Sequence, residues 1–377
     1  MKRTLWIVAG ALLAIYLIYS SLGRKAPNAE SELRLARTIN AGDKRDGKAK
    51  NLLGIQPFML PADYASEERF EKKLDGYLAA AKSSGLIGER TVAVFPEYIG
   101  TWLAAADEKS AVYEATRLGP AMETVVMSNL LSFLRWLPFT HGPERAKEAL
   151  FHMKAARMAT IYERVFSRLA ARYHLTVVAG SIVLPSPSID RGRLRTGSGD
   201  LYNVGAVFAP DGTLQAPLVR KAFPTAEELP FLRAGDVREL PVFATPAGKL
   251  GVLICADSFF PAAYDVLRQQ GVELIAVPSF LAEDEVWKKP WRGYNGAAAP
   301  ADVNAADIGR LSEGQAWWKY ALAARLPGAH ARAGINVFLR GRLWDLGAAG
   351  PPYAISAAGL LLGPEDSDAA LINVWFD

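Results

Sequence analysis

The stretch GVLICADSFFP, residues 251–261, carries the only cysteine of the chain, Cys255, at the end of a short apolar run. Asp257 and a turn follow at once, the pattern of a buried strand that ends at the edge of a sheet. Packing alone would explain a lone buried cysteine, which behaves as a small hydrophobic residue. The end of a strand is also where open α/β folds place their ligands. Partner residues elsewhere in the chain must decide between these two explanations.

Short apolar runs alternate with helix-length segments on both sides of this stretch. We predict strands at 52–60, 90–97, 175–184, 249–257, 272–279, 335–341, 353–363 and 369–377, and helices at 66–85, 145–173, 261–271 and 317–334. Residues 202–223 are predicted as two strands joined at Asp211-Gly212, a strong hairpin signal. This alternation predicts an α/β protein with layered sheets and with helices outside.

Two further reactive side chains follow predicted strands. They are Glu97 in VAVFPEYIG and Lys221 in LVRKAFP. Alone, Glu97 is explained by a helix cap and Lys221 by the usual surface position of lysine. With Cys255 they form a set with one chemistry, because a neutral thiol needs a base and an oxyanion needs a positive charge. The set favours a thiol-dependent acyl-transfer site over simple packing.

The chain resembles the nitrilase, or carbon–nitrogen hydrolase, superfamily in three motifs that occur in the family's order. These are FPE at 95–97, RK at 220–221 and CAD at 255–257, supported by GIQP at 54–57, VVAGS at 177–181 and IAVPS at 275–279. The resemblance covers about residues 50–377. It implies a nitrilase-like four-layer αββα sandwich and a catalytic triad of Glu97, Lys221 and Cys255.

The resemblance also implies a mechanism and supporting residues. Cys255 would form a thioester while Glu97 moves protons, and Lys221 with the backbone N–H of Ala256 would stabilise the oxyanion. The family often has a second glutamate after the lysine, and Glu227 and Glu228 both qualify; we choose Glu228. Asp257 supports the turn after Cys255, and its role is equally well explained as structural or catalytic. In place of the aromatic residue that often follows the cysteine, this chain has Ala256.

The segment after the strand at 272–279 helps to line the substrate site in relatives. Ser279, Phe280 and Trp287 are therefore the candidate substrate-binding residues of this chain. Residues 282–318 form a long connection with four tryptophans, a length that is often functional. Trp287 and Trp291 would form an apolar wall of the site, or would only pack the loop down; the sequence leaves both open.

The N-terminus, MKRTLWIVAGALLAIYLIYSSLGRK, has an apolar run long enough to cross a bilayer. A cleaved signal peptide would have a shorter run and a small-x-small site. We therefore expect residues 1–22 to be an uncleaved single-pass anchor in the cell membrane, or signal-anchor. Basic residues flank both ends, so the side on which the catalytic domain lies stays open.

Residues 23–50 are expected to be a polar, basic tether with a short helix at 29–38, and residues 51–377 the hydrolase domain. Residues 1–50 carry ten Lys and Arg against four Asp and Glu. The excess positive charge thus belongs to the N-terminal tail, which argues against a nucleic-acid-binding face. Residues 122–139 are helical in period with a narrow polar stripe, which indicates a core helix, or a helix at the membrane surface or over the pocket.

These observations predict a membrane-tethered hydrolase of non-peptide C–N bonds, with an amide favoured over a nitrile and the substrate a small or lipid-like amide. One alternative is an N-acyltransferase in which an amine captures the thioester. A second is a non-catalytic binding protein with the same fold. No cofactor is expected, and no metal, because the four histidines lack metal-site spacing. Relatives form dimers, which implies a homodimer or higher homo-oligomer here.

Overall fold

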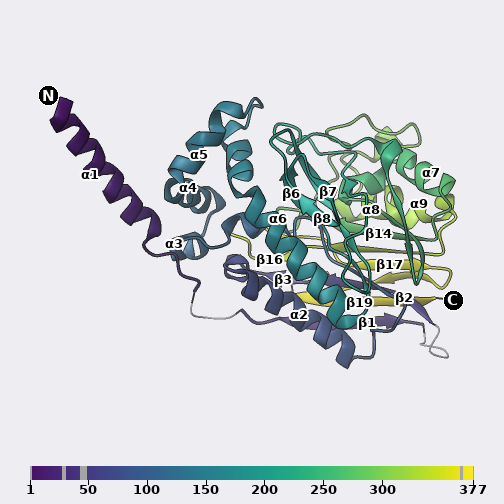
Figure 1. Cartoon of the computed structure of the whole chain (residues 1–377). Helices are drawn as coiled ribbons and strands as arrows, with labels where there is room; N and C mark the ends of the chain where they lie inside the picture. Colours follow the sequence, from purple (N-terminus) through teal and green to yellow (C-terminus); the bar gives the residue numbers. More distant parts are fainter. Residues whose placement is uncertain (1, 28–30, 43–48, 366–367, 377) are drawn as a thin grey trace.

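A computed structural model describes residues 2–27, 31–42, 49–365 and 368–376. Two six-stranded sheets lie at its centre (Figure 1). The first has the strand order β1, β19, β2, β4, β5, β10. Its strands are β1 (Leu35–Ala41), β2 (Lys50–Gln56), β4 (Thr91–Val94), β5 (Thr176–Val178), β10 (Val207–Phe208) and β19 (Ala369–Phe376).

The second sheet has the order β12, β13, β14, β15, β17, β18. Its strands are β12 (Val242–Thr245), β13 (Gly248–Val252), β14 (Leu274–Ser279), β15 (Ala333–Phe338), β17 (Tyr353–Ser356) and β18 (Gly359–Leu362). Smaller sheets contain β6 (Ile182–Pro185), β9 (Leu201–Gly205) and β11 (Val219–Arg220); β3 (Phe58–Met59) and β16 (Arg340–Gly341); and β7 (Ser188–Asp190) and β8 (Arg193–Arg195).

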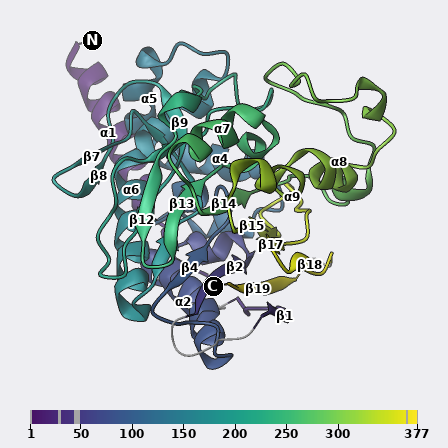
Figure 2. The ribbon, with the colours of Figure 1, turned by 90° about the vertical axis from the view of Figure 1, so that its right-hand side faces the viewer.

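Helices cover the outer face of each sheet, so the predicted four-layer αββα sandwich is confirmed (Figures 1 and 2). On the first sheet lie α2 (Glu67–Ser83) and α6 (Arg145–Tyr173), and on the second lie α7 (Pro261–Gln269), α8 (Glu313–Tyr320) and α9 (Leu322–Arg325). The central strands bury both faces. In β4, Ala93 packs toward α2 and α6, while Val92 and Val94 join the cluster shared with the second sheet. This explains why such strands are continuously apolar rather than alternating.

The parallel strands direct several loops to one edge of the sandwich. In the first sheet β2, β4 and β5 are parallel, and in the second β13, β14 and β15 are parallel. Glu97 follows β4, Cys255 follows β13, and Phe280 follows β14. The carboxyl ends of parallel strands are the usual ligand-binding edge of α/β folds. The site therefore follows from the topology.

Part of the segment predicted as a tether, residues 23–50, is a strand of the first sheet. The expected helix at 29–38 is wrong within the described residues: Leu35–Ala41 is strand β1, paired in parallel with β19. Residues 28–30 and 43–48 lie outside the described residues. Without β1, the edge of β19 would present unpaired backbone N–H and C=O groups, and β1 pairs with them. The Asn373 side-chain amide also donates to Asn40 Oδ1 at 2.7 Å. The sheet therefore begins at residue 35 rather than after residue 50.

Several predicted elements are broken into shorter ones. Residues 122–139 form α4 (Leu118–Ser128), α5 (Leu130–Trp136) and a single turn of 3₁₀ helix at Leu137–Phe139, with α3 (Ser110–Glu114) before them. The helix predicted at 317–334 stops at Tyr320, restarts as α9 and gives way to a 3₁₀ turn containing Pro327. The strand predicted at 175–184 divides at Gly180 into β5 and β6, which belong to different sheets.

The N-terminal helix α1 (Lys2–Ser21) projects from the body of the protein (Figure 1). Its segment Thr4–Ser21 has a mean hydropathy of 1.8, and none of it is buried. By length and composition it is the one described helix that could cross a membrane.

Candidate active site

Glu97, Lys221 and Glu228 form a compact buried cluster at the edge defined by the strand ends. The Lys221 ammonium lies 2.8 Å from Oε1 of Glu97 and 2.7 Å from Oε2 of Glu228. All three side chains are almost fully buried. The structure thus places Glu228 against the lysine, whereas Glu227 is exposed and its carboxylate faces the Asn295 amide.

The loop that carries Glu97 depends on a close approach of two backbones. Gly180 adopts φ +64°, and a Cβ at this position would lie 2.0 Å from the Pro96 carbonyl oxygen. Only glycine fits such a contact in a left-handed conformation. Tyr98, after Glu97, also has a positive φ of 61°, and its N–H donates to Ser181 Oγ at 2.9 Å. The VVAGS segment therefore holds the carboxylate in place.

Cys255 occupies a strained turn beside this cluster. Its φ is +51°, which costs a non-glycine residue about 1–2 kcal/mol. Its thiol lies 3.7 Å from the Phe280 carbonyl oxygen, and its proximity to Glu97 acts to lower the pKa of that carboxyl group. The Phe280 N–H in turn donates to Oε2 of Glu97 at 3.1 Å. Phe280 thus contacts both the thiol and the carboxylate through its backbone.

Asp257 joins the cysteine turn to the lysine segment. Its Oδ1 accepts the N–H groups of Ala222 at 3.0 Å and Phe223 at 2.8 Å, and its Oδ2 accepts that of Ile254 at 3.2 Å. Burial raises the pKa of Asp257 to about 7, although Lys221 and the backbone donors lower it. These contacts hold the residues before Cys255 and after Lys221 at a fixed separation.

Two residues that the sequence analysis did not select complete the cluster. The Asn203 amide donates to Oε1 of Glu97 at 2.9 Å and to Oε1 of Glu228 at 3.3 Å. The Tyr98 hydroxyl donates to the same oxygen of Glu228. A polar residue inside the predicted strand of 202–223 and an aromatic residue directly after Glu97 were the available signals. Neither has a motif that would separate it from ordinary strand and loop residues.

The environment separates the pKa values of the two carboxyl groups. Burial raises the pKa of Glu97, and the charge of Glu228 adds to this effect, while Lys221 opposes it. Burial also acts to raise the pKa of Glu228, but the Lys221 ammonium and hydrogen bonds hold it below its ordinary value. Divergent environments of this kind mark one group for proton transfer and the other for a permanent charge.

The lysine and the thiol are also perturbed. Burial lowers the pKa of Lys221, but Glu228 and Glu97 together raise it well above its ordinary range. Burial, and then the Glu97 charge, raises the pKa of the Cys255 thiol well above its ordinary range. At neutral pH the site therefore holds an ammonium and a neutral thiol, which needs a base before it can attack.

The remaining predicted residues lie in different surroundings. Ala256 is the second residue of a 3₁₀ helix, Cys255–Phe259, whose first N–H groups have no acceptor within the turn. Ser279 is buried and donates to Asn336 Oδ1 at 3.0 Å. Trp287 packs against the rings of Trp317, Trp318 and Phe338. These ring contacts place it among the aromatic side chains of α8 and β15.

Two hollows open elsewhere on the described surface. Trp287 lines one of about 290 Å³ together with Trp318 and Gln315. Trp344 and Tyr113 line the other, of about 340 Å³. The triad lines neither. Among the described residues no group of three or more His, Cys, Asp or Glu side chains could hold a metal ion.

The profile of the carbon–nitrogen hydrolase family matches residues 73–302, and the chain belongs to this family. A bifunctional nitrilase/nitrile hydratase of Nicotiana tabacum is 31% identical over 130 residues, which are 31% of this chain and 36% of the relative. A probable hydrolase of Bacillus subtilis is 25% identical over 160 residues, 42% of this chain and 27% of the relative. The matched region thus spans about a third of the length of these curated relatives.

Solved structures resemble the protein over nearly its whole length. The amidase from Nesterenkonia sp. AN1, as a double mutant in complex with acrylamide, has a TM-score of 0.56 at 14% identity and covers 89% of this chain and 94% of its own. A carbon–nitrogen hydrolase from Helicobacter pylori has a TM-score of 0.53 at 14% identity, with 87% and 89% covered. These likenesses establish the nitrilase fold.

Proposed function

We propose that the protein is a membrane-anchored, thiol-dependent hydrolase of non-peptide amide bonds, with Cys255 as nucleophile, Glu97 as proton carrier and Lys221 as oxyanion partner. The observation that carries the proposal is one buried cluster, in which Lys221 contacts Glu97 directly and the Phe280 backbone contacts both Glu97 and the Cys255 thiol. In a mutant of the Nesterenkonia amidase, the acetamide moiety of fluoroacetamide is added covalently to the active-site cysteine. That adduct marks the amidase cysteine as a nucleophile, and Cys255 is the one thiol of this chain that could serve as one.

The reaction then proceeds in two steps, acylation of Cys255 and hydrolysis of the thioester. Glu97 accepts the thiol proton while the sulfur bonds to the amide carbon, and the C–N bond breaks as Glu97 returns that proton to the leaving amine. Water attacks the thioester, gives a proton to Glu97 and releases the acid. The proton then returns to the sulfur.

Lys221 and Glu228 have separate parts in this scheme. A lysine has three N–H donors, and two of them point to Glu97 and Glu228. The third is available to the developing oxyanion, beside the N–H of Ala256. Glu228 stays ionised and, with Asn203 and Tyr98, orients the ammonium.

Contacts at the end of α1 support an anchor that is retained. The Ser20 hydroxyl donates to the Ser128 carbonyl oxygen at 2.7 Å, and Arg24 Nε donates to the Ser20 carbonyl oxygen at 2.8 Å. A signal peptide that is removed has no need of a polar joint to the folded body. Single-pass anchoring therefore accounts for both the apolar run and its attachment.

The test is intact-mass analysis of the full-length protein incubated with amides and nitriles of rising chain length. The expected result is free acid from amides with the unaltered protein, together with an acyl adduct on Cys255 after rapid acid quenching, and neither acid nor adduct with Glu97→Gln or Cys255→Ala. Adding an amine acceptor separates hydrolysis from acyl transfer, since an amide product without acid would favour the acyltransferase. No adduct and no product with any substrate would support a non-catalytic protein.

The same panel tests the size of the substrate. A rate that rises with acyl chain length supports a lipid-like substrate, and a flat profile removes that idea. A homo-oligomer is part of the proposal, and light scattering of the purified protein tests it.

A further inference from the structure

An exposed apolar surface lies next to the anchor helix and has no role in the proposed chemistry. We name it the apolar shelf and define it by the exposed side chains of Met127, Leu131, Leu134 and Phe139, on α4, α5 and the turn after them. Their exposed fractions range from 49% to 63%. Outside the first 22 residues, they are four of the eight large hydrophobic side chains exposed in the described part of the chain.

The shelf is not the outer face of an ordinary amphipathic helix pair. The inward faces of α4 and α5 already bury Val125, Ser128 and Phe133 against the body. The polar Ser128 is therefore inside, while Leu131 and Leu134 face outward. The segment 118–139 carries only two charged residues, Glu123 and Arg135. Apolar side chains on the solvent side of a charge-poor segment mark a surface that contacts something apolar.

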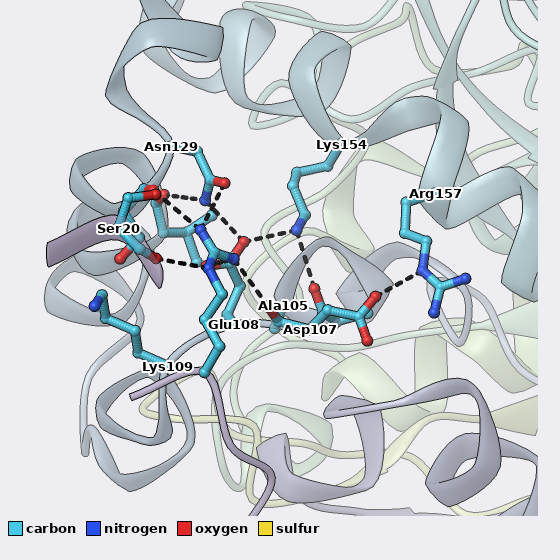
Figure 3. A network of polar contacts seen from close by, with 12 residues as sticks. Ser20, Ala105, Asp107, Glu108, Lys109, Asn129, Lys154 and Arg157 are labelled. Carbon is cyan, nitrogen blue, oxygen red and sulfur yellow. Dashed lines mark hydrogen bonds and ion pairs between the residues drawn. The ribbon is translucent and has the colours of Figure 1, made fainter. Parts of the chain in front are cut away.

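A polar joint fixes the end of α1 against this segment (Figure 3). Arg24 donates to Oδ1 of Asn129 at 2.9 Å and to the carbonyl oxygen of Ser128 at 3.0 Å, at the junction of α4 and α5. Arg24 also lies 3.0 Å from Oε2 of Glu108. The other carboxylate oxygen of Glu108 accepts from Lys154 at 2.7 Å and from Asn129 at 2.8 Å.

This joint sets the depth of the shelf once α1 spans a bilayer. Eighteen helical residues, Thr4–Ser21, are about 27 Å long, close to the hydrocarbon thickness of about 30 Å. The end of α1 at Ser21 then lies at the membrane surface. In both views α4 and α5 lie alongside the C-terminal half of α1, not beyond its end (Figures 1 and 2). The shelf thus falls at the level of the headgroups and upper acyl chains.

We propose that the apolar shelf inserts into the lipid interface beside α1, so that the catalytic domain is docked on the bilayer in one orientation instead of hanging from a flexible tether. Interfacial segments bind by burying apolar side chains about 5–10 Å deep while the charged ones stay at the surface. Continuity with the anchor identifies the occupant as lipid. The inference rests on the anchoring part of the proposed function, and is independent of its chemistry.

The single cysteine of the chain makes a direct test available. In full-length Cys255→Ala, which has no thiol, we would introduce Leu131→Cys, Leu134→Cys or Phe139→Cys, label each with an environment-sensitive fluorophore, and reconstitute the protein in vesicles of neutral and anionic phospholipid. Leu13→Cys within α1 reports the anchor itself. Leu360→Cys and Leu362→Cys are matched controls, because these leucines are 45% and 49% exposed on β18, away from α1.

The expected result is blue-shifted emission at positions 131, 134 and 139, with several-fold stronger quenching by nitroxide lipids than at 360 and 362. Labels at the shelf that remain accessible to aqueous iodide while position 13 is in lipid would overturn the docking and leave the anchor intact. A label at position 13 that is exposed to water would overturn both the docking of the shelf and the membrane anchor. A blue shift without quenching by nitroxide lipids would show that protein, such as a second copy, covers the shelf, and would also overturn the proposal.

Discussion

The amide nitrogen of Asn203 lies 2.9 Å from Oε1 of Glu97, the same oxygen that accepts the Lys221 ammonium. This carboxylate oxygen therefore receives two donors before any substrate arrives. Hydrogen bonds to a carboxylate favour its charged form. Asn203 thus opposes the effect of burial, which raises the pKa of Glu97, and keeps the group ready to accept a proton.

Replacing Asn203 with alanine should therefore change the pH profile as well as the rate. A hydrogen bond to a charged group is worth about 1.5–3 kcal/mol, so kcat should fall by tenfold or more. The loss of the donor should raise the pKa of Glu97 further and move the acid limb of kcat/KM to higher pH. A lower rate with an unmoved acid limb would mean that Asn203 only supports the fold.

Glu228→Gln should move the acid limb in the opposite direction. Glu97 must be ionised to take the thiol proton, and its pKa lies above the ordinary 4.5, so activity falls as the pH drops through that raised value. The Glu228 charge is one cause of the increase, and its removal lowers the pKa of Glu97. The limb should shift to lower pH while kcat decreases, because Lys221 loses a partner. Glu227→Gln, on the exposed neighbour, is the matched control and should leave the profile unchanged.

The same cluster also predicts that kcat/KM stays constant well into the alkaline pH range. The pKa of Lys221 lies well above its ordinary 10.5, so the ammonium persists as the pH rises to that value. A fall in kcat/KM with a midpoint near neutrality that is absent from a Lys221→Arg variant would contradict this assignment.

Cys255 should limit stability as well as carry the reaction. Cys255→Ala should reduce hydrolysis at least about a thousandfold, as expected for a nucleophile. Cys255→Gly should be equally inactive yet more stable than Cys255→Ala by about 1 kcal/mol, because glycine tolerates the φ of +51°. Ala256→Gly, at a residue without positive φ, should not stabilise the protein. Equal melting temperatures for the alanine and glycine variants at 255 would show that the turn is unstrained.

The sequence was sufficient where a local signal matched the tertiary structure. The helix predicted at 66–85 begins where Ser66 caps α2 by accepting from the Arg69 N–H, and the predicted helix at 145–173 coincides with α6. The strand ends at Glu97 and Cys255 were visible because buried parallel strands are continuous apolar runs. These signals predicted an α/β fold with reactive side chains at strand ends, and the order of the three motifs added the four-layer sandwich as an implication of the resemblance.

Features that depend on distant partners escaped prediction. Strand β1 forms because β19, more than 300 residues later, offers a free edge, and nothing within residues 35–41 announces that edge. Asn203 and Tyr98 gain their significance only from carboxylates that other loops supply. The division of 122–139 at Asn129 reflects Glu108 and Arg24, which bind its side chain from two other segments. Sequence periodicity carries no information about such contacts.

Glu108 should be the most sensitive residue of the joint between α1 and the body. Its carboxylate is fully buried and holds Arg24 at 3.0 Å and Lys154 at 2.7 Å. Removing one partner of a buried ion pair costs about 3–5 kcal/mol, because the remaining charge is left uncompensated. Glu108→Ala should therefore destabilise the protein strongly, since Lys154 is also mostly buried.

Arg24→Ala should cost far less, because the Arg24 side chain is 27% exposed and Glu108 keeps Lys154 as a partner. Thermal unfolding of the full-length protein in detergent compares the two variants. The double variant Glu108→Gln with Lys154→Met removes both buried charges and should recover much of the stability lost in Glu108→Ala. A double variant as unstable as Glu108→Ala would show that packing around residue 108, and not the unpaired ammonium, determines the loss.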